Sequence, residues 1–311
     1  MKIALIGLGD IAVKAHLPVL TQIENVEWVF CTRNPERLQQ LAKKYHVNET
    51  YTDYRDLAKA GVDAVMIHSA TSSHPILAEY FLKLGVPVFV DKPLADNYQQ
   101  CEQLYDLAES HQVPLFMGFN RRYIPLYQQF LPGVTGDNQT TPPLLSLRWE
   151  KHRHDFPGEA RTFIFDDFIH PLDSINVNAS ISPDDTYVTS QFVQRGGQTL
   201  LGRLDVQWQQ GETLFHASMN RQHGATMETV SANYQNASYR FDSFTEGSCW
   251  QGYKEERLKL ADWTPMLAAK GFHAMAEHWL EVVSAGKQSH SLTQRNLHSH
   301  LLAEHLVKQM K

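Results

Sequence analysis

The sequence has few of the features that mark several large protein classes. It holds three cysteines in 311 residues, Cys31, Cys101 and Cys249, and no C-x-x-C pair. An odd, small and scattered set of cysteines argues against a disulfide framework and a cysteine-rich zinc site, and favours a reducing compartment. Glycine (17) and proline (14) are too few for a collagen-like or linker-dominated chain.

Long apolar runs and an excess of basic charge are also missing. The first apolar run, Lys2–Ile6, ends at a glycine and is too short for the core of a signal peptide. No run approaches the ~20 residues of a membrane span. The formal net charge is −6, which removes the electrostatic argument for nucleic-acid binding. We therefore expect a cytoplasmic protein whose partners are neither membranes nor nucleic acids.

Strand-like and helix-like segments alternate over about the first 120 residues. Short apolar runs, such as Lys2–Ile6 and 63–67, are separated by segments with helical spacing, such as Pro35–Tyr45. Continuous apolar strands between helices are typical of a parallel sheet covered on both faces. The sequence thus predicts a doubly wound α/β domain, whose ligands bind at the carboxyl ends of the strands.

The pattern changes after about residue 120, where six strand-like segments follow one another without helices between them, as in an antiparallel sheet. The predicted strands cover residues 144–150, 187–194, 199–208, 213–220, 227–234 and 238–242. Helical patterns at about 271–285 and 293–308 close the chain, and 132–143 reads as a loop. We predict two domains, residues 1–121 and 122–311, the second being α+β with an open, mostly antiparallel sheet.

A glycine-rich turn follows the first predicted strand. Gly7-Leu8-Gly9-Asp10-Ile11-Ala12 fits G-x-G-x-x-A and precedes an apolar segment, the context that a dinucleotide-binding turn requires. Gly7 permits the tight turn, Gly9 lets the backbone approach a pyrophosphate, and Ala12 lets the helix pack closely on the strand. Pro18 is expected to bend or shorten that helix.

The end of the second predicted strand bears on the choice of cofactor. NAD-binding chains usually place an acidic residue there, to hold the ribose 2′-hydroxyl. Here the strand ends in Cys31-Thr32-Arg33-Asn34, without an acid. Arg33 offers a guanidinium and Thr32 a hydroxyl to a 2′-phosphate, which favours NADP. In the alternative, Arg33 is a solvated loop charge and NAD is also accepted.

Asp91-Lys92-Pro93 follows a buried strand, so Lys92 is expected at the crevice where a nicotinamide would lie. An ammonium there can stabilise charge on a reacting substrate oxygen. The alternative is an ordinary surface lysine.

With these motifs the chain resembles the Gfo/Idh/MocA family of oxidoreductases, most closely the subgroup of the virulence factor MviM. The likeness is carried by the glycine turn, Thr71–His74, Asp91–Pro93, Gly118–Arg122, 151–153 and 166–170. The family usually has Glu where this chain has Asp91.

The resemblance implies an N-terminal Rossmann domain and a set of cofactor contacts. The residues implied are Gly7, Gly9, Asp10, Ile11, Ala12, Thr32, Arg33, Thr71, His74, Lys92, Pro93, Asn120 and Arg121.

The family also implies a second catalytic motif, here Asp166, His170 and Asp173. If the segment is α-helical, the spacing i, i+4 and i+7 places all three on one face. His170 would take the hydroxyl proton while hydride leaves for the nicotinamide, and Asp166 would support it. Asp167 is the alternative partner if the register differs by one. The family's preceding glycines are replaced by Phe163-Ile164-Phe165, and Pro171 interrupts the helix unless it lies in the first turn.

Other histidine pairs are poor metal sites. His152-x-His154 and His298-x-His300 lack cysteine partners and suit a strand rather than a helix. We expect no metal. Lys151, His152 and Arg153 instead favour a pocket for an anionic or polyhydroxylated substrate.

Together these features predict an NADP-dependent oxidoreductase acting on a secondary alcohol or ketone of a sugar, sugar derivative or cyclitol. Lys92, His170 and Asp166 are the predicted catalytic residues. The alternatives are a non-catalytic NADP(H)-binding sensor or regulator, and a nicotinamide-assisted glycoside hydrolase. The resemblance also implies a homodimer or homotetramer formed through the C-terminal sheet.

Overall fold

The computed structural model describes residues 1–134 and 143–310, within which the chain forms two compact units. The first contains Met1–Phe119 and Phe272–Thr293, and the second contains Asn120–Gly271 and the chain from Gln294 on. The helix near residue 272, which the sequence pattern placed with the C-terminal half, therefore clusters with the N-terminal unit. The expected division into two domains, residues 1–121 and 122–311, stays a prediction.

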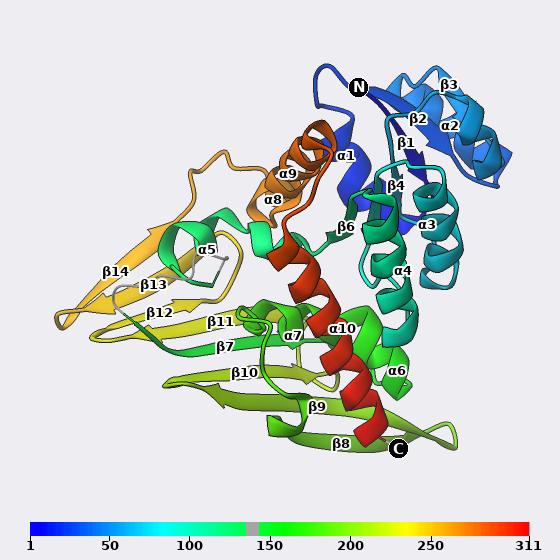
Figure 1. Ribbon diagram of the computed structural model, residues 1–311. Coiled ribbons are helices and arrows are strands. Elements are labelled where there is room, and N and C mark those ends of the chain that lie inside the picture. Colours follow the sequence, from blue (N-terminus) through cyan, green and yellow to red (C-terminus); the bar gives the residue numbers. More distant parts are fainter. Residues whose placement is uncertain (135–142, 311) are drawn as a thin grey trace. The chain divides into compact units, whose positions relative to one another are not determined.

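The first unit is built on one six-stranded parallel sheet, in the order β3-β2-β1-β4-β5-β6 (Figure 1). Its strands are β1 (Lys2–Ile6), β2 (Glu27–Cys31), β3 (Glu49–Tyr51), β4 (Ala64–Ile67), β5 (Val88–Asp91) and β6 (Leu115–Gly118). This strand order is that of a doubly wound dinucleotide-binding sheet. It confirms the predicted fold class of the N-terminal part.

Helices follow the strands, as the alternating pattern predicted. They are η1 (Ala12–His16), α1 (Leu17–Leu20), α2 (Pro35–Tyr45), η2 (Tyr54–Lys59), η3 (Thr71–Ser73), α3 (His74–Lys83), α4 (Tyr98–His111) and α9 (Phe272–Ala285). Helix α3 packs beside α4, and α9 packs beside α1. Trp279 of α9 lies against Phe89 and Phe116, with ring centres 5.9 and 5.6 Å apart. This contact explains why α9 belongs to the first unit.

The second unit is built on an eight-stranded sheet, in the order β14-β13-β12-β11-β7-β10-β9-β8 (Figure 1). Its strands are β7 (Leu144–His152), β8 (Tyr187–Arg195), β9 (Gln198–Gln210), β10 (Thr213–Asn220), β11 (Met227–Tyr234), β12 (Ala237–Phe241), β13 (Glu246–Gln251) and β14 (Lys254–Lys259). All neighbours are antiparallel except β7 and β10. The predicted open, mostly antiparallel sheet is confirmed.

The second unit also contains short helical segments and one long helix. They are η4 (Asn120–Tyr123), α5 (Pro125–Phe130), α6 (Ala160–Thr162), η5 (Phe163–Phe168), α7 (Ile169–Ile175), η6 (Pro183–Asp185), α8 (Met266–Ala269) and α10 (His290–Gln309), whose first turn lies in the first unit. Helix α7 contacts β7 and β10. Along β7 the inward positions are Leu147, Trp149 and Lys151, all buried. An alternating strand thus carries a lysine into the core face.

Two parts of the sheet were not predicted. Strands β13 and β14 lack a strong alternating apolar pattern, and in β14 only Leu258 is buried. An edge strand of this kind is held by its backbone ladder more than by its side chains. Of the loop predicted over 132–143, residues 135–142 lie outside the described residues.

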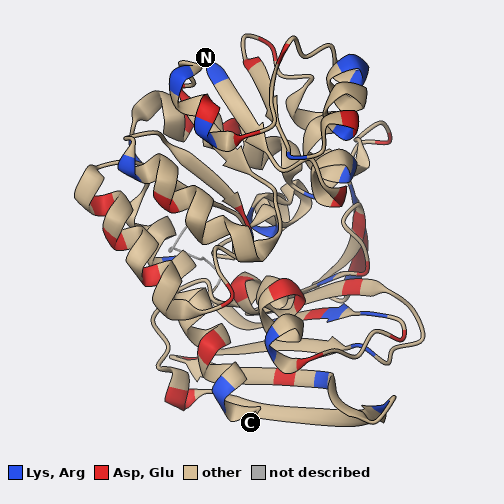
Figure 2. Ribbon diagram, turned by 90° about the vertical axis from the view of Figure 1, so that its right-hand side faces the viewer, with Lys and Arg blue, Asp and Glu red and all other residues tan. Residues whose placement is uncertain are grey.

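Charges of both signs are interspersed in the view of Figure 2. Among the described residues, no helix combines the length and apolar character needed to cross a membrane.

Candidate active site

The glycine turn after β1 fits a bound dinucleotide. Gly7 has φ +88°, and a Cβ there would lie 2.6 Å from the backbone nitrogen of Ser69, so only glycine fits. Gly9 is different, because a Cβ built on it meets no atom within 4 Å. Gly7 therefore serves the protein's own packing, whereas Gly9 keeps open the space that a pyrophosphate would fill.

The segment after the turn is a distorted helix. Ala12 is fully buried, whereas Asp10 and Ile11 are exposed. Ala12–His16 is π-helical, and Pro18 lies in the first turn of the four-residue helix α1. The helical segment continues through Pro18 to Leu20 and is distorted before it, so the expected effect of Pro18 stays a prediction. Lys14 donates a 2.7 Å hydrogen bond to Asp10, and this contact lowers the pKa of the carboxyl.

Two arginines follow β2, Arg33 directly after the strand and Arg37 in helix α2. Thr32 is partly buried and Arg33 is exposed. Asn34 caps α2 by accepting from the Arg37 backbone N–H, and the Arg37 Nε donates to the Leu8 carbonyl at 2.6 Å. Arg37 was not singled out from the sequence, because its contact with Leu8 joins residues that are 29 positions apart in the chain.

The segments after β4 and β5 are joined by a buried histidine. His74 Nδ1 lies 2.8 Å from the Pro93 carbonyl and Nε2 lies 2.9 Å from the Ser69 carbonyl. The Lys92–Pro93 peptide is cis. The Asp91 carboxylate accepts from the Lys92 backbone N–H at 2.8 Å. Thr71 starts η3 in the same region. Whether Thr71, His74 or Pro93 contacts a cofactor stays a prediction.

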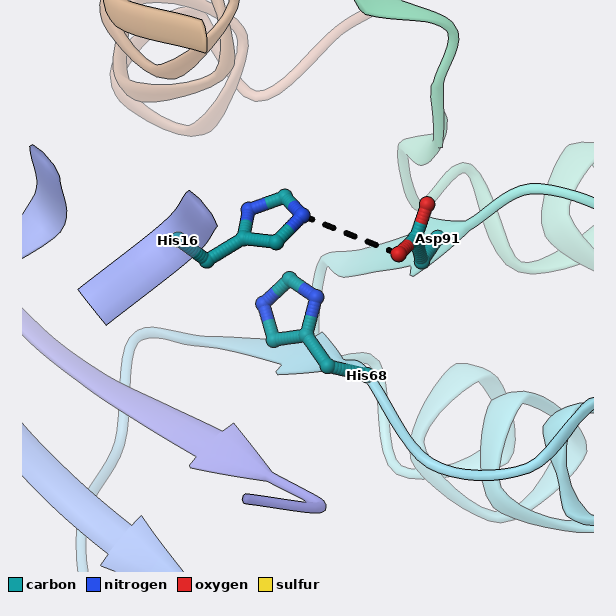
Figure 3. A group of neighbouring side chains, drawn as sticks. All are labelled: His16, His68 and Asp91. Carbon is teal, nitrogen blue, oxygen red and sulfur yellow. Dashed lines mark ion pairs between the residues drawn. The ribbon is translucent and has the colours of Figure 1, made fainter. Parts of the chain in front are cut away.

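Beneath this strand end, His16, His68 and Asp91 form a buried group (Figure 3). His16 Nε2 lies 3.7 Å from an Asp91 oxygen. Burial works to raise the pKa of Asp91, but His16 and Lys92 outweigh it and hold that pKa below its ordinary value. Burial, together with the charge of His16, lowers the pKa of His68. We therefore expect His68 to be neutral and Asp91 to be ionised.

The ligand atoms of these three residues lie within 4.8 Å of one another, close enough to consider a metal. The two imidazoles, however, lie close together and tilted, with centres 3.9 Å apart and planes 34° apart. Two imidazoles on one tetrahedral zinc, with Zn–N near 2.0 Å, have centres about 5 Å apart. The short distance between the rings disfavours a shared ion, and the absence of a metal stays a prediction.

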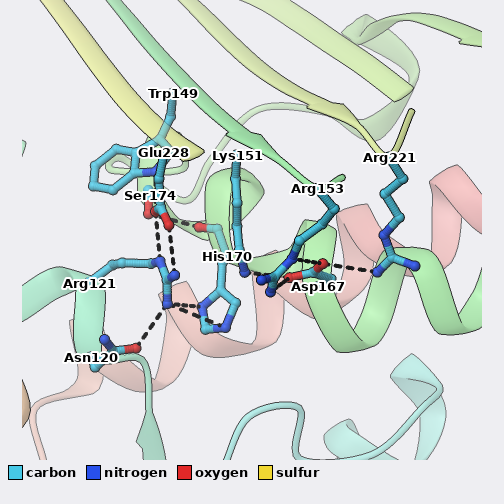
Figure 4. Close-up of polar contacts among 10 residues, drawn as sticks. All are labelled: Asn120, Arg121, Trp149, Lys151, Arg153, Asp167, His170, Ser174, Arg221 and Glu228. Atoms are coloured by element: carbon cyan, nitrogen blue, oxygen red, sulfur yellow. Dashed lines mark hydrogen bonds and ion pairs between the residues drawn. The ribbon is translucent and has the colours of Figure 1, made fainter. Parts of the chain in front are cut away.

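In the second unit, Arg121 connects His170 to a buried carboxylate (Figure 4). Its Nε and Nη2 each donate to Glu228 at 2.8 Å, and its Nη1 lies 3.0 Å from His170 Nδ1. Trp149 also donates to Glu228, and Nη1 reaches the Asn120 side-chain oxygen at 3.2 Å. Burial opposes ionisation of Glu228, but the Arg121 charge outweighs it and lowers the pKa.

Beside His170, Asp167 is surrounded by three cations (Figure 4). Arg153 donates twice at 2.9 Å, Arg221 donates at 3.1 Å, and Lys151 forms a short ion pair. Burial would raise the pKa of Asp167, yet Lys151 and Arg153 hold it below its ordinary value.

For Lys151, burial outweighs the effect of the neighbouring carboxylates on the pKa. Asp167 favours its ammonium, but burial, first, and the Arg121 charge, second, lower its pKa to about 7. Lys151 can therefore change charge near neutral pH.

The residues of the predicted Asp-His-Asp motif do not share a face. Phe163–Phe168 is π-helical, and this i→i+5 spacing changes the offset on which the one-face argument rested. Asp166 is exposed, whereas His170 and Asp173 are buried. Asp173 is held by Arg122, which donates from Nε at 2.9 Å, and by Ser299 at 2.7 Å. Pro171 lies in the first turn of α7, where a proline is tolerated.

The other histidine pairs have ordinary contacts. His152 stacks on His223 at 4.6 Å, and His298 contacts Asn176 and Ile181. Burial lowers the pKa of His300 to about 4. Of the Lys151-His152-Arg153 triplet, Lys151 and Arg153 contact Asp167, whereas His152 stacks on His223.

Several relatives match nearly the whole chain. An oxidoreductase structure from Vibrio cholerae, described as Gfo/Idh/MocA family, is 57% identical, with a TM-score of 0.95, over 100% of this chain and 98% of that one. The chain belongs to the Gfo/Idh/MocA family. A dehydrogenase (MviM) structure from Clostridium difficile is 25% identical, with a TM-score of 0.88, over 99% of both chains. A protein of Salmonella typhimurium named YceM is 29% identical over 91% of this chain and 89% of its own length.

The family model described as "Oxidoreductase family, NAD-binding Rossmann fold" matches residues 1–119. The predicted enzyme class, an NAD(P)-dependent oxidoreductase acting on CH–OH groups, is thereby confirmed.

Two more distant relatives have names that bear on chemistry. A myo-inositol 2-dehydrogenase of Thermotoga maritima is 29% identical over 47% of this chain and 44% of its own length. KijD10 of Actinomadura kijaniata, a 3-ketoreductase solved with TDP-benzene and NADP, is 16% identical with a TM-score of 0.77, over 98% of this chain and 96% of its own. That likeness shows the shared fold alone.

The family places its predicted site residues in both units of this chain. Lys92 lies in the first unit, and Asn120, Arg121, Asp166 and His170 lie in the second. The meeting of Lys92 and His170 over one substrate stays a prediction. Sequence reasoning missed Arg37, Glu228 and Arg221, because their contacts depend on partners that are distant in the chain.

Proposed function

We propose that this enzyme is an NADP-dependent oxidoreductase that interconverts a secondary alcohol and a ketone on a sugar, sugar derivative or cyclitol. The observation that carries the proposal is the contact between Arg121 and His170. A guanidinium can only donate, so the imidazole nitrogen that faces it must present a lone pair. The contact therefore favours the neutral imidazole, and its lone pair can take a proton from a substrate hydroxyl once that hydroxyl replaces Arg121 as its partner.

The catalytic roles follow from the chemistry of each side chain. When bound, the nicotinamide accepts or donates the hydride. His170 holds the hydroxyl proton during oxidation and returns it during reduction. Lys92 hydrogen-bonds the reacting oxygen and stabilises the charge that develops on it. Asp166 supports His170, with Asp167 as the alternative.

The cofactor contacts are proposed on the first unit and the strand that leads out of it. Gly7, Gly9, Asp10, Ile11 and Ala12 would hold the pyrophosphate, Thr32 and Arg33 the 2′-phosphate, and Thr71, His74, Lys92, Pro93, Asn120 and Arg121 the nicotinamide side. The open space at Gly9 supports the first group.

The preference for NADP over NAD rests on Arg33 and the missing acid at the end of β2. Fluorescence titration is expected to give tighter binding of NADPH than of NADH. Arg33→Asp should reverse part of this preference, by about 10- to 100-fold, since hydrogen bonds to charged groups contribute about 1.5–3 kcal/mol. Lys43→Asp, an exposed change in helix α2 that follows Arg33, is the control. An Arg33→Asp enzyme with unchanged preference would remove the 2′-phosphate assignment.

The reaction is tested with a panel of sugars, cyclitols and polyols at saturating cofactor. Lys92→Ala should abolish hydride transfer while NADPH still binds. Normal turnover by this variant would contradict the mechanism. Release of a sugar without net use of NADPH would indicate the nicotinamide-assisted hydrolase instead.

We also propose that the enzyme is cytoplasmic and associates as a dimer or tetramer through sheet β14–β8. Exposed apolar side chains on its strands, including Tyr187, Phe192 and Leu214, support this surface. Sedimentation of wild type and Leu214→Lys tests it, with a shift toward monomer expected in the variant.

A further inference from the structure

The network around His170 contains more positive than negative charge. Its cations are Arg121, Lys151, Arg153 and Arg221, and its buried carboxylates are Asp167 and Glu228 (Figure 4). Asp166 adds a third negative charge, which acts on Arg221 and favours its guanidinium, so four cations still face three carboxylates. The network therefore holds an uncompensated positive charge in a largely buried place.

Both carboxylates are already paired with cations. Glu228 accepts from Nε and Nη2 of Arg121 and from the indole N–H of Trp149. Asp167 divides its two oxygens among three cations. Each oxygen of both acids therefore already has a partner within this network.

The cations differ in how far they reach the surface. The side chain of Arg221 is 3% exposed, and its guanidinium lies 4.3 Å from the centre of the Phe163 ring. The side chain of Arg153 is 36% exposed, and Asp167 engages only its Nε and Nη2. Within the described residues, the Nη1 of Arg153 has no hydrogen-bond acceptor. Arg221 thus anchors Asp167, while Arg153 can present N–H groups outward.

Buried charge without a counter-charge is unfavourable, and the protein has two ways to relieve it. Lys151 can release its proton, which its pKa of about 7 permits. Alternatively, an anion can bind and restore the balance, and it would also gain charge-assisted hydrogen bonds.

We propose that the substrate of this site is an anionic sugar, whose carboxylate or phosphate binds to Lys151 and Arg153 beside His170. This inference rests on the proposed oxidation of a polyhydroxylated substrate and narrows its class. The anion positions the sugar, and the hydroxyl that reacts is the one brought to His170.

The test uses D-glucose, D-galactose and D-mannose, each as the neutral sugar, the uronic acid and the 6-phosphate. Binding at saturating NADPH is measured by calorimetry, and turnover with NADP is measured in parallel. We expect at least one charged form to bind 10-fold or more tightly than its neutral counterpart. The uronic acids and phosphates distinguish the two sources of the anion. A panel in which no charged form outperforms its neutral sugar overturns the inference.

Variants test whether Lys151 and Arg153 bind the anion, as opposed to any positive charge on the same strand. Lys151→Met and Arg153→Gln should each reduce the preference for the charged form 10-fold or more. Arg148→Gln, on the outward face of the same strand, should leave it unchanged. An unchanged preference in a folded Arg153→Gln enzyme would also overturn the inference, even if Lys151→Met fails to fold.

Proton uptake gives an independent readout. Above pH 7, anion binding should draw a proton onto Lys151, under the charges of Arg121, Arg153, Asp167 and Glu228 that surround it. Calorimetry in two buffers of different ionisation enthalpy should detect this uptake in wild type and not in Lys151→Met.

Failure of this inference is distinguishable from failure of the proposed function. If neutral sugars are oxidised and acids are ignored, the oxidoreductase stands and the anion site falls. If acids bind with proton uptake but none is oxidised or reduced, the anion site stands and the proposed reaction falls.

Discussion

Arg121 places its Nη1 3.0 Å from Nδ1 of His170 while its other two donors hold Glu228. The side chains of Arg121 and Glu228 are mostly buried, at 14% and 8% exposure. Glu228, on β11, thus holds the guanidinium that contacts the imidazole of His170. The residue that we propose as the base is therefore oriented by two successive contacts that no short motif contains.

Removal of one partner of the Arg121–Glu228 pair should be costly. Glu228→Gln leaves a buried guanidinium without its counter-charge, and we expect a loss of about 3–5 kcal/mol in the free energy of unfolding. Arg121→Met combined with Glu228→Gln should recover part of this loss, because no unpaired charge remains. Urea denaturation measures both. A Glu228→Gln protein as stable as wild type would show that the pair is not energetically coupled.

Gly7 and Gly9 should respond differently to alanine. Gly7→Ala forces a side chain into φ +88° and against the backbone of Ser69, so the protein should lose stability, by about 1–2 kcal/mol from the backbone conformation alone. Gly9→Ala meets no protein atom, so stability should change by less than about 1 kcal/mol. NADPH affinity should nevertheless fall 10-fold or more. Thermal unfolding and fluorescence titration give the two readouts, and normal NADPH binding by Gly9→Ala would exclude a pyrophosphate at this turn.

The neighbouring acids Asp166 and Asp167 can be told apart by the same kind of comparison. Asp167→Asn leaves the buried Lys151 and Arg221 and the partly exposed Arg153 without their shared carboxylate, and should cost about 3–5 kcal/mol of stability. Asp166→Asn changes an exposed residue, and stability should stay within about 0.5 kcal/mol. If Asp166 supports His170, its variant lowers kcat about 10-fold or more. An Asp166→Asn enzyme with normal kcat would move the supporting role to Asp167.

Lys151 should make stability depend on pH above neutrality. Its pKa is about 7 in the folded protein against 10.5 ordinarily, so the unfolded chain binds more protons between these values. Stability therefore rises with pH from about 7 to 10.5, by up to about 1.4 kcal/mol per pH unit from this group, and this contribution is flat below pH 7. Lys151→Met should remove the rise and be more stable than wild type at pH 6. Urea denaturation of both proteins at pH 6, 7.5 and 9 measures the difference, and a variant less stable at pH 6 would show that the Asp167 pair dominates.

Much of the first unit could be predicted from local sequence. A buried strand, a capped helix and a glycine turn are each encoded within a few adjacent residues. The run Lys2–Ile6, the Asn34 cap with Pro35, and Gly7 with Gly9 therefore led directly to the parallel sheet and its dinucleotide turn. The same local motifs carried the resemblance to the oxidoreductase family.

Only the tertiary structure decided the surroundings of the predicted base. The sequence suggested His170 and an adjacent acid, but the π-helical segment separated Asp166 from the buried face and turned Asp167 into it. Arg121 and Glu228 are 107 residues apart, and Arg221 and Asp167 are 54 apart. Pairs of this kind form because sheet and helix bring distant residues into a low-dielectric interior, where charges must find partners. No periodicity or spacing in the chain records which partner that is.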